Sequence, residues 1–507
     1  MKNNTATFPH LLLQPGKIKD QFYFSLKKMI LKGELAPGSK LPSSRSFSSL
    51  MSISRNSVLA GIERLIDEGY LFTKQGSGTY VSTTRPDQLI HVEKSSSIQT
   101  LAETTIPVDV STSVQRLQPV WDKSAAAIGK DQLFSIGIGC TDLFPHALWG
   151  RLLSRAWRYY PQQTSHSNDP MGFLPLRQAI AAYASATRGL HCTAEHILIT
   201  HGTQQAINLT AQVLLKQGDE VWLDEPGYDG ALGAFTAMGA KVRPVVSDQE
   251  GMDIAYGIQH WPNAKMIFTA PSHQFPLGGT LSLSRRLALL DWATENQAWI
   301  FEDDYNSEFR YKSRPIQALQ GLDTTQRVIY AGTFSKMMFP ELRLGFLVLP
   351  PTLTQAFKLA KHYADSSNAY LEQATLAMFI AEGHYARHVR RVRKACDERQ
   401  QSLIAAIQHD LPKHFQLVPS DSGIHLLCYL AAPWVEKEMI EKCRQLGIGA
   451  QPLSRYCQNP ISKPGILFGF AAHTPSEIQQ GIQILAQELL KTADHRSSQN
   501  TVSLSSI

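Results

Sequence analysis

Long apolar runs are absent from the sequence, and so is an N-terminal apolar stretch of the kind that a secretory signal peptide needs. We therefore expect a cytoplasmic protein without a membrane partner.

Cysteine is scarce and no two cysteines form a C-x-x-C pair; the six are Cys140, Cys192, Cys396, Cys428, Cys443 and Cys457. This spacing favours reduced structural thiols over a disulfide framework or a zinc site, so no metal is predicted.

Excess charge of either sign is missing from most of the chain. The formal net charge is +6, yet residues 1–85 alone hold twelve Lys or Arg and five Asp or Glu, a net charge of +7. The rest of the chain therefore carries −1. A small basic segment on a nearly neutral body predicts a polyanionic partner for that segment, although a solvated basic surface is the alternative interpretation.

The length of 507 residues is too great for one ordinary core, and the apolar share of 43% suits a globular protein of two or more domains. Residues 84–130 are rich in Ser, Thr and Gln, contain three prolines and show weak periodicity. They predict an interdomain linker with room for one docked segment. The chain then divides into a basic domain (1–83), this linker, an α/β domain (131–491) and a polar, disordered tail (492–507).

The basic N-terminal segment predicts three helices followed by a hairpin. An amphipathic pattern spans residues 17–32 and ends at Gly33 and the Pro37-Gly38 pair. Ser43 can cap a second helix, whose first turn holds Arg45. A cation is unfavourable at the start of a helix, and this one is easier to explain if it faces phosphate.

The third helix has a polar first turn that faces away from its apolar side. Arg55, Asn56 and Ser57 form this turn, and a helix that begins in this way suits insertion into the major groove of DNA. Two short strands follow and are joined at a glycine-rich tip, where Gly76 allows close approach to a nucleic-acid backbone. For each of these residues alone, a solvated surface position is the alternative.

Four motifs in this segment stand in the order found in GntR-type winged helices. They are P-G-x-x-L-P-S-S-R, S-R-x-x-V, L-x-x-E-G-Y and G-S-G-T-Y-V. The segment is therefore similar to that family over its whole length, and a winged helix-turn-helix fold is expected. The resemblance implies that operator DNA is the partner and that it contacts Arg45, Arg55, Asn56, Ser57 and Gly76.

Beyond residue 134, short apolar strands alternate with helical stretches. Examples of the strands are residues 196–200, 220–223, 265–269, 298–301 and 327–330. Strands that are separated by helices predict a mostly parallel sheet covered on both faces.

Polar residues at the ends of two of these strands suggest a cofactor. Residues 200–206 follow a strand and open a helix, so the hydroxyl of Thr203 and the free helix amides can cradle a phosphate. A capped helix without a ligand is the simpler interpretation. Tyr228 follows the next strand and can stack on a cofactor ring, with a partly buried tyrosine in a turn as the alternative.

Two further strand ends carry charge that a buried sheet edge tolerates only with a partner. Asp303 and Asp304 end one strand, and a pyridinium nitrogen is a suitable partner for a carboxylate there, with a metal ion as the rival. Lys336 follows the next strand and can form a Schiff base with an aldehyde cofactor. Three neighbours can bind the phosphate of that cofactor: Thr333, Ser335 and Arg343.

From about residue 168 to residue 471 the chain resembles the fold-type-I, pyridoxal 5'-phosphate (PLP) aminotransferases, and among them the MocR/GabR regulators. The resemblance rests on T-A-P-S-H-Q-F-P-x-G (269–278), E-D-D-Y-x-S-E-F-R-Y (302–311) and G-T-F-S-K (332–336). It implies an α/β aminotransferase-like fold with PLP as cofactor. The implied roles are a Schiff base at Lys336, bonds to the ring nitrogen from Asp303 and to the ring hydroxyl from Tyr305, stacking by Tyr228, and phosphate binding by Thr203, Gln204, Ser335 and Arg343.

Two positions depart from the pattern of that family. Many aminotransferases have Asn where this chain has Phe275, which cannot bond the ring hydroxyl, so Tyr305 must do more. The GABA-responsive regulator of the family has an effector-binding Arg two residues after its stacking Tyr, and here that position is Gly230. Arg455 is the remaining candidate for binding an effector carboxylate, with a surface arginine as the alternative.

The combination predicts a PLP-dependent transcriptional regulator that senses PLP or an amino compound. The resemblance implies a homodimer in which each DNA-binding head is swapped over the partner. A catalytically active aminotransferase is the second hypothesis, and a binding module that has lost PLP is the third.

Overall fold

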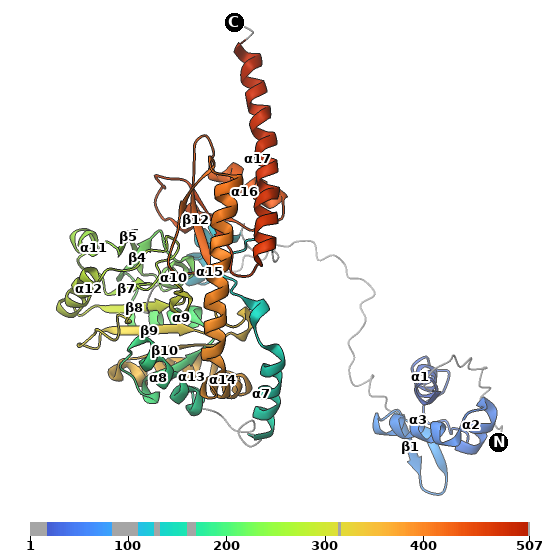
Figure 1. Ribbon diagram of the computed structural model, residues 1–507. Coiled ribbons are helices and arrows are strands. Elements are labelled where there is room, and N and C mark those ends of the chain that lie inside the picture. Colours follow the sequence, from blue (N-terminus) through green and yellow to red (C-terminus); the bar gives the residue numbers. More distant parts are fainter. Residues whose placement is uncertain (1–17, 84–109, 126–131, 160–168, 313–315, 505–507) are drawn as a thin grey trace. The chain divides into compact units, whose positions relative to one another are not determined.

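The computed structural model describes residues 18–83, 110–125, 132–159, 169–312 and 316–504. The chain forms two compact units, Met1–Val108 and Asp109–Ile507, and each has its own hydrophobic core (Figure 1). No helix in the described part of the chain has both the length and the apolar composition needed to cross a membrane.

The first unit is a winged helix, as predicted. Helices α1 (Ile18–Leu31), α2 (Ser44–Met51) and α3 (Arg55–Asp67) precede an antiparallel hairpin of β1 (Leu71–Lys74) and β2 (Gly78–Val81). The hydroxyls of Ser43 and Ser54 cap α2 and α3, because each accepts a hydrogen bond from the backbone N–H three residues later. These caps fix where the two helices of the helix-turn-helix begin.

A single core joins the helices to the wing. Its members include Phe22, Leu26, Phe47, Val58, Ile62, Leu65, Leu71 and Val81. Gly61 lies on the side of α3 that packs against α1, where a Cβ atom would come within 2.6 Å of the Phe22 ring. The glycine therefore permits a close helix crossing, which holds α3 in position.

The second unit contains an eight-stranded sheet in the order β3-β10-β9-β8-β7-β4-β5-β6. Neighbouring strands from β9 to β5 pair in parallel, whereas β10 is antiparallel to both of its neighbours and β6 is antiparallel to β5. The strands are β3 (Ile197–Thr200), β4 (Glu220–Glu225), β5 (Lys241–Asp248), β6 (Gly251–Met252), β7 (Met266–Thr269), β8 (Trp299–Asp304), β9 (Val328–Thr333) and β10 (Gly345–Val348). The predicted mostly parallel sheet is confirmed.

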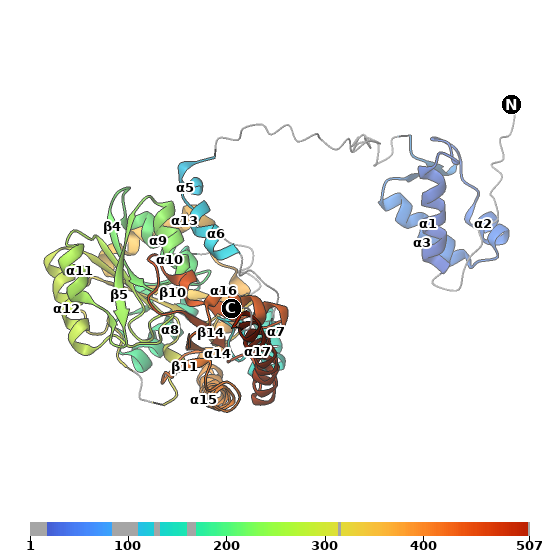
Figure 2. The same cartoon turned by 90° about the horizontal axis from the view of Figure 1, so that it is seen from above.

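Helices cover both faces of this sheet because consecutive strand residues point to opposite sides. Leu223 of β4 packs with α9 (Thr203–Leu214) and α10 (Asp229–Ala237), while its neighbour Trp222 packs with α11 (Ile254–His260) and α12 (Leu283–Glu295). Figure 2 shows these two helix pairs on opposite sides of β4 and β5. The alternation explains why the strands appear in the sequence as continuous apolar runs.

A smaller antiparallel sheet lies toward the C-terminus and was not singled out from the sequence. Its order is β11-β12-β14-β13, formed by β11 (Phe415–Val418), β12 (His425–Leu430), β13 (Gln451–Pro452) and β14 (Gly465–Gly469). The remaining helices are α7 (His146–Tyr159), α8 (Leu174–Arg188), α13 (Thr354–Asp365), α14 (Tyr370–Ala381), α15 (His384–Asp410), α16 (Glu436–Gln445) and α17 (Pro475–Leu504). Figure 1 shows α15 and α17 running side by side along this sheet.

The structure describes parts of the predicted linker and of the predicted tail. Within residues 84–130, two short helices, α5 (Thr112–Gln115) and α6 (Gln118–Ala125), pack on α10 of the second unit, while residues 84–109 and 126–130 lie outside the described residues. At the other end, α17 continues through Leu504, although a disordered tail was predicted from residue 492. The sequence after Gly481 contains no Pro or Gly that would end the helix.

Replacing Gly61 by alanine tests the close crossing of α1 and α3. A Gly→Ala change inside an unobstructed helix stabilises it by about 1 kcal/mol. Here the added methyl group meets the Phe22 ring, so we expect Gly61→Ala to destabilise the first unit by about 1–3 kcal/mol. Thermal unfolding of a fragment that ends at Val108 measures the effect. Ala60→Gly, at an exposed neighbouring position, provides the ordinary helix-propensity change as a control. A rise in unfolding temperature for Gly61→Ala would contradict the packing.

Candidate functional site

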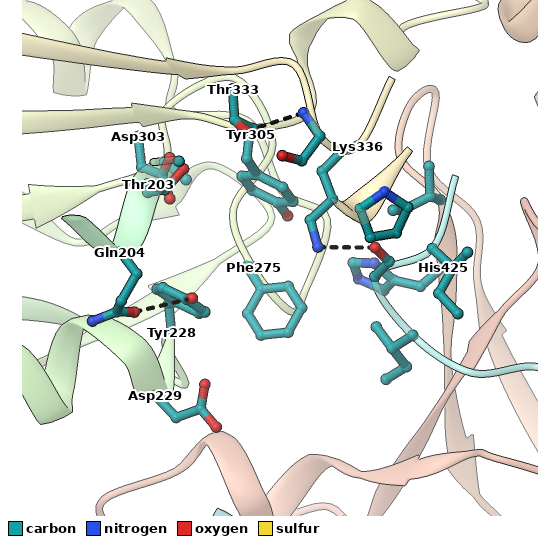
Figure 3. Close-up of a pocket in the computed structure, with 18 of the residues that line it drawn as sticks. Thr203, Gln204, Tyr228, Asp229, Phe275, Asp303, Tyr305, Thr333, Lys336 and His425 are labelled. Atoms are coloured by element: carbon teal, nitrogen blue, oxygen red, sulfur yellow. Dashed lines mark hydrogen bonds between the residues drawn. The ribbon is translucent and has the colours of Figure 1, made fainter. Parts of the chain in front are cut away.

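The carboxyl ends of the parallel strands surround a cavity of about 460 Å³. Its lining includes all the residues that the sequence predicted for a cofactor: Thr203, Gln204, Tyr228, Asp303, Tyr305, Thr333, Ser335, Lys336 and Arg343. Figure 3 shows Asp303, Thr203 and Lys336, from different elements, arranged around a common space. The carboxyl edge of a parallel sheet is where α/β proteins usually bind their ligands.

Lys336 follows β9 and reaches into this cavity. Its Nζ donates a 2.9 Å hydrogen bond to the carbonyl oxygen of Gly137, which lies on another part of the lining (Figure 3). Burial lowers the pKa of Lys336, with the negative charge of Asp303 acting in the opposite direction. A lowered pKa enlarges the neutral fraction of the amine, which is the form that attacks an aldehyde carbon.

Asp303 and Tyr305 present polar atoms to the cavity that no other described protein group satisfies. The Oδ1 atom of Asp303 and the hydroxyl of Tyr305 are buried without a hydrogen-bond partner. Burial, with a smaller contribution from Asp304, raises the pKa of Asp303 to about 8. Because a buried carboxylate is unfavourable without a counter-charge, the Asp303 side chain is suited to pair with a protonated ring nitrogen. The phenol of Tyr305 can pair with a ring hydroxyl. The two residues therefore fit the groups that PLP presents.

The acidic residues on either side of Asp303 are held by the protein itself. Glu302 accepts hydrogen bonds of 2.8 Å from two backbone N–H groups, those of Leu319 and Gln320. Asp304 is paired with Arg188 at 2.7 Å and accepts a 2.5 Å hydrogen bond from Tyr330. Of these three consecutive carboxyls, that of Asp303 is the one that lines the cavity.

A phosphate could be bound where α9 begins. Gly202 precedes the helix with a positive φ of 85°, and its turn leaves the first backbone N–H groups of α9 free to point at an anion. Thr203, Ser335 and Arg343 line the same cavity. Thr333 also has a local role, since its hydroxyl accepts a hydrogen bond from the Ser335 backbone N–H at 3.3 Å.

A polar cluster beneath this region was missed from the sequence. Asp365 of α13 lies 3.2 Å from His201, accepts a 2.6 Å hydrogen bond from Gln205 and is ion-paired with the fully buried Lys361. His201 lines the cavity and belongs to the same strand-end motif as Thr203, which was the available signal. The cluster joins α13 to the start of α9 and so supports the candidate phosphate site.

Tyr228 and Phe275 form an aromatic wall of the cavity (Figure 3). The Tyr228 hydroxyl lies 3.4 Å from the Gln204 side-chain oxygen, and the Gln204 amide donates to the Gly230 carbonyl at 2.9 Å. Gln204, predicted to bind phosphate, is therefore engaged in positioning the tyrosine. At Gly230 a Cβ atom would lie 2.3 Å from Gln204 and 2.5 Å from Tyr228, which explains why this position carries no side chain.

Arg455 also lines the cavity, but its guanidinium already has protein partners. Nη2 is paired with Asp229 at 3.0 Å, and Nη1 donates to the Gln451 side chain at 3.1 Å. The sequence did not single out Asp229, whose position directly after Tyr228 was the available signal.

The predicted DNA-contacting residues lie on the surface of the first unit. Arg45, Arg55, Asn56 and Gly76 are exposed. Arg55 reaches across to α2 and donates a 3.3 Å hydrogen bond to Ser44, so the first turns of α2 and α3 form a common surface. Ser57 is half-buried, and both its backbone N–H and its hydroxyl bond the capping Ser54.

Comparisons with known proteins agree with both units. Residues 18–81 match the family of bacterial regulatory proteins of the gntR type, and residues 159–485 match the aminotransferase class I and II family. The probable rhizopine catabolism regulatory protein MocR of Rhizobium meliloti is 34% identical over 93% of each chain. The pyridoxine biosynthesis transcriptional regulator PdxR of Corynebacterium glutamicum is 29% identical over 92% of this chain and 94% of its own.

The solved structures confirm the fold of the second unit. The α-aminoadipate aminotransferase LysN of Thermus thermophilus, solved with N-(5'-phosphopyridoxyl)-L-leucine, superposes with a TM-score of 0.69 and 24% identity, over 75% of this chain and 97% of its own. With a winged helix of the GntR type, an aminotransferase class I and II domain and regulators related along nearly the whole chain, this protein belongs to the MocR-type family of transcriptional regulators.

Proposed function

We propose that this regulator binds PLP at Lys336 and uses the filled cavity to sense either PLP itself or a primary amine. The observation that carries the proposal is the meeting of three buried groups in one cavity: the amine of Lys336, the carboxyl of Asp303 and the phenol of Tyr305. PLP presents an aldehyde, a ring nitrogen and a ring hydroxyl, one for each of them. The match to the aminotransferase class I and II family supports the same cofactor.

The side chains of the site would divide the work as follows. Bound PLP supplies an aldehyde carbon that an amine can attack. The amine of Lys336 would be the nucleophile toward that carbon. Asp303 would keep a proton on the ring nitrogen, and Tyr305 would bond the ring hydroxyl. Tyr228 covers the ring face, and the phosphate is bound by Thr203, Thr333, Ser335 and Arg343. Gln204 acts through its contact with Tyr228, and the ion pair of Arg455 with Asp229 lines the part of the cavity left for the effector.

The same site could serve a catalytic aminotransferase, which is the second candidate function. A sensor needs only that ligand binding favours one arrangement of the protein over another, whereas an enzyme must also move protons and release product. The GntR-type DNA-binding unit has a use only in the sensor. The names of the full-length relatives, which describe regulators, favour the sensor as well.

On the DNA side, we propose that Arg55 and Asn56 read base edges, while Arg45 and Gly76 contact the backbone and Ser57 positions the start of α3. The functional form would be a homodimer with swapped DNA-binding heads, acting on operator DNA in the cytoplasm. Two heads would then meet two half-sites, as in other dimeric helix-turn-helix proteins.

Chemical labelling tests the assignment of Lys336. Reduction of the purified holoprotein with borohydride should fix a pyridoxyl group on Lys336, detected by peptide mapping. Lys336→Ala should lose this covalent label yet retain some noncovalent PLP through the phosphate contacts. Lys394→Ala, at an exposed position on α15, is the control and should keep the label on Lys336. A label on another lysine of the wild-type protein would refute the assignment.

Asp303→Asn tests the partner of the ring nitrogen. The amide keeps the shape of the side chain but cannot carry the opposite charge, so PLP should be held about 1.5–3 kcal/mol more weakly. Equilibrium dialysis of PLP against the wild type and the variant measures this loss. Asp291→Asn, an exposed position on α12, serves as the matched control. Equal affinities of the wild type and Asp303→Asn for PLP would remove Asp303 from the site.

Arg55→Ala tests the DNA-contacting surface. If Arg55 reads a base edge, the variant should lose about 1–3 kcal/mol of specific operator binding. Binding of the wild type should also weaken as salt rises, because phosphate contacts release counterions. Gel-shift titrations on a selected operator measure both effects, with the exposed Arg390→Ala on α15 as control. An operator affinity unaffected by Arg55→Ala would exclude this role for Arg55.

A further inference from the structure

The wall of the cavity around Arg455 is electrically balanced before any effector arrives. Arg455 and Asp229 form a 3.0 Å ion pair whose side chains are only 17% and 23% exposed. Gln451 accepts a hydrogen bond from a second terminal nitrogen of the guanidinium, and the remaining nitrogen, Nε, is buried without a hydrogen-bond partner. Both terminal nitrogens thus already have protein acceptors and Nε is buried, so the two-point grip that arginine makes on a carboxylate would require the guanidinium to leave Asp229 or Gln451.

Both members of the pair are held in place by their surroundings. Asp229 stands in the first turn of α10, where a negative charge is favoured by the helix dipole. The guanidinium of Arg455 lies 5.5 Å from the ring centre of Tyr456, and the Tyr456 carbonyl accepts a 2.9 Å hydrogen bond from Gly227, two residues before Asp229. The two segments are thus fastened together beside the ion pair. An incoming carboxylate would have to break this pair and leave Asp229 without its counter-charge.

The other cationic groups of the cavity do not offer a free site for a carboxylate. Among the described lining residues, Lys336 and Arg343 are engaged with PLP in the proposed function. Two histidines remain, and burial lowers the pKa of His425 to about 4 and also lowers that of His201. Both are therefore mainly neutral at neutral pH. An amine that also carries a carboxylate finds no unpaired positive charge in this lining.

We propose that the cavity selects neutral polar primary amines, such as those with hydroxyl or amide groups, over amines that carry a carboxylate, and that Asp229 determines this specificity. A hydroxyl or amide group can exchange hydrogen bonds with Asp229 and Gln451 while the ion pair stays intact. Figure 3 shows the Lys336 amine and the Asp229 carboxylate on opposite sides of the Phe275 ring, and the far end of a bound amine would lie on the Asp229 side. This inference rests on the proposed function, since it assumes that a primary amine is sensed next to PLP.

The inference is tested with pairs of amines in which a carboxylate replaces a hydroxyl or an amide group. The PLP-loaded full-length protein is titrated with ethanolamine and glycine, and with β-alaninamide and β-alanine, while the visible absorbance of the cofactor and the heat of binding are recorded. The wild type should bind each neutral amine about ten-fold or more tightly than its acid counterpart, because the acid must displace Asp229. In Asp229→Asn the Arg455 guanidinium loses the carboxylate with which it is paired. The ratio of the affinity for the neutral amine to that for the acid should therefore shift toward the acid by about ten-fold. Asp291→Asn should keep the wild-type ratio.

The ratio is measured within one protein sample, so partial unfolding of a variant does not change it. Tighter binding of the acids by the wild type would overturn the inference, and so would an unchanged ratio in Asp229→Asn, while the proposed function would stand. If PLP is bound but no amine alters its absorbance or releases heat, amine sensing itself is wrong and the selectivity falls with it.

Discussion

Burial of the Asp303 carboxyl at the edge of a parallel sheet is unfavourable unless a proton or a cation meets it. The carboxyl of Glu302 and the Oδ2 atom of Asp304 have protein partners. Oδ1 of Asp304, Oδ1 of Asp303 and the hydroxyl of Tyr305 have none among the described residues, and of these Asp303 and Tyr305 line the cavity. A ligand with a protonated ring nitrogen and a hydroxyl relieves both. Because such a ligand binds the folded protein and not the unfolded chain, it also stabilises the fold by mass action. The unsatisfied groups thus link cofactor binding to the stability of the whole second unit.

The need of these buried groups for a partner also bears on regulation. A ligand can shift a conformational equilibrium only by the difference in its affinity for the two states. A cavity built from the ends of several strands and from loops far apart in the chain is sensitive to small movements, because Lys336, Asp303 and Arg455 belong to separate elements. Whether or not a reaction follows, a ligand that fills this cavity changes the balance of charge at the edge of the sheet. A sensing domain can transmit such a change to a DNA-binding unit.

Local patterns predicted much of this arrangement. The winged helix followed from serine caps, apolar periodicity and a glycine-rich tip, all of which act within a few residues. The strand-end positions of Tyr228, Asp303 and Lys336 followed from the alternation of strands and helices.

Pairings between distant residues could not be predicted from such local patterns. Asp229 meets Arg455 across 226 positions of sequence, and His201 meets Asp365 only because α13 packs against α9. The antiparallel insertion of β10 and the smaller sheet are likewise set by tertiary pairing, which leaves no periodic signature in the chain.

In the function that we propose, ligand in the cavity acts on DNA binding and not chiefly on turnover. The direct measurement mixes the full-length protein with operator DNA, PLP, a panel of primary amines and 2-oxoglutarate, and follows operator affinity and keto-acid product in the same samples. The account predicts that PLP or an amine changes operator affinity by roughly 5–150-fold, the usual range of allosteric coupling, while product stays negligible. Steady multiple turnover, with operator binding indifferent to every ligand, would contradict it.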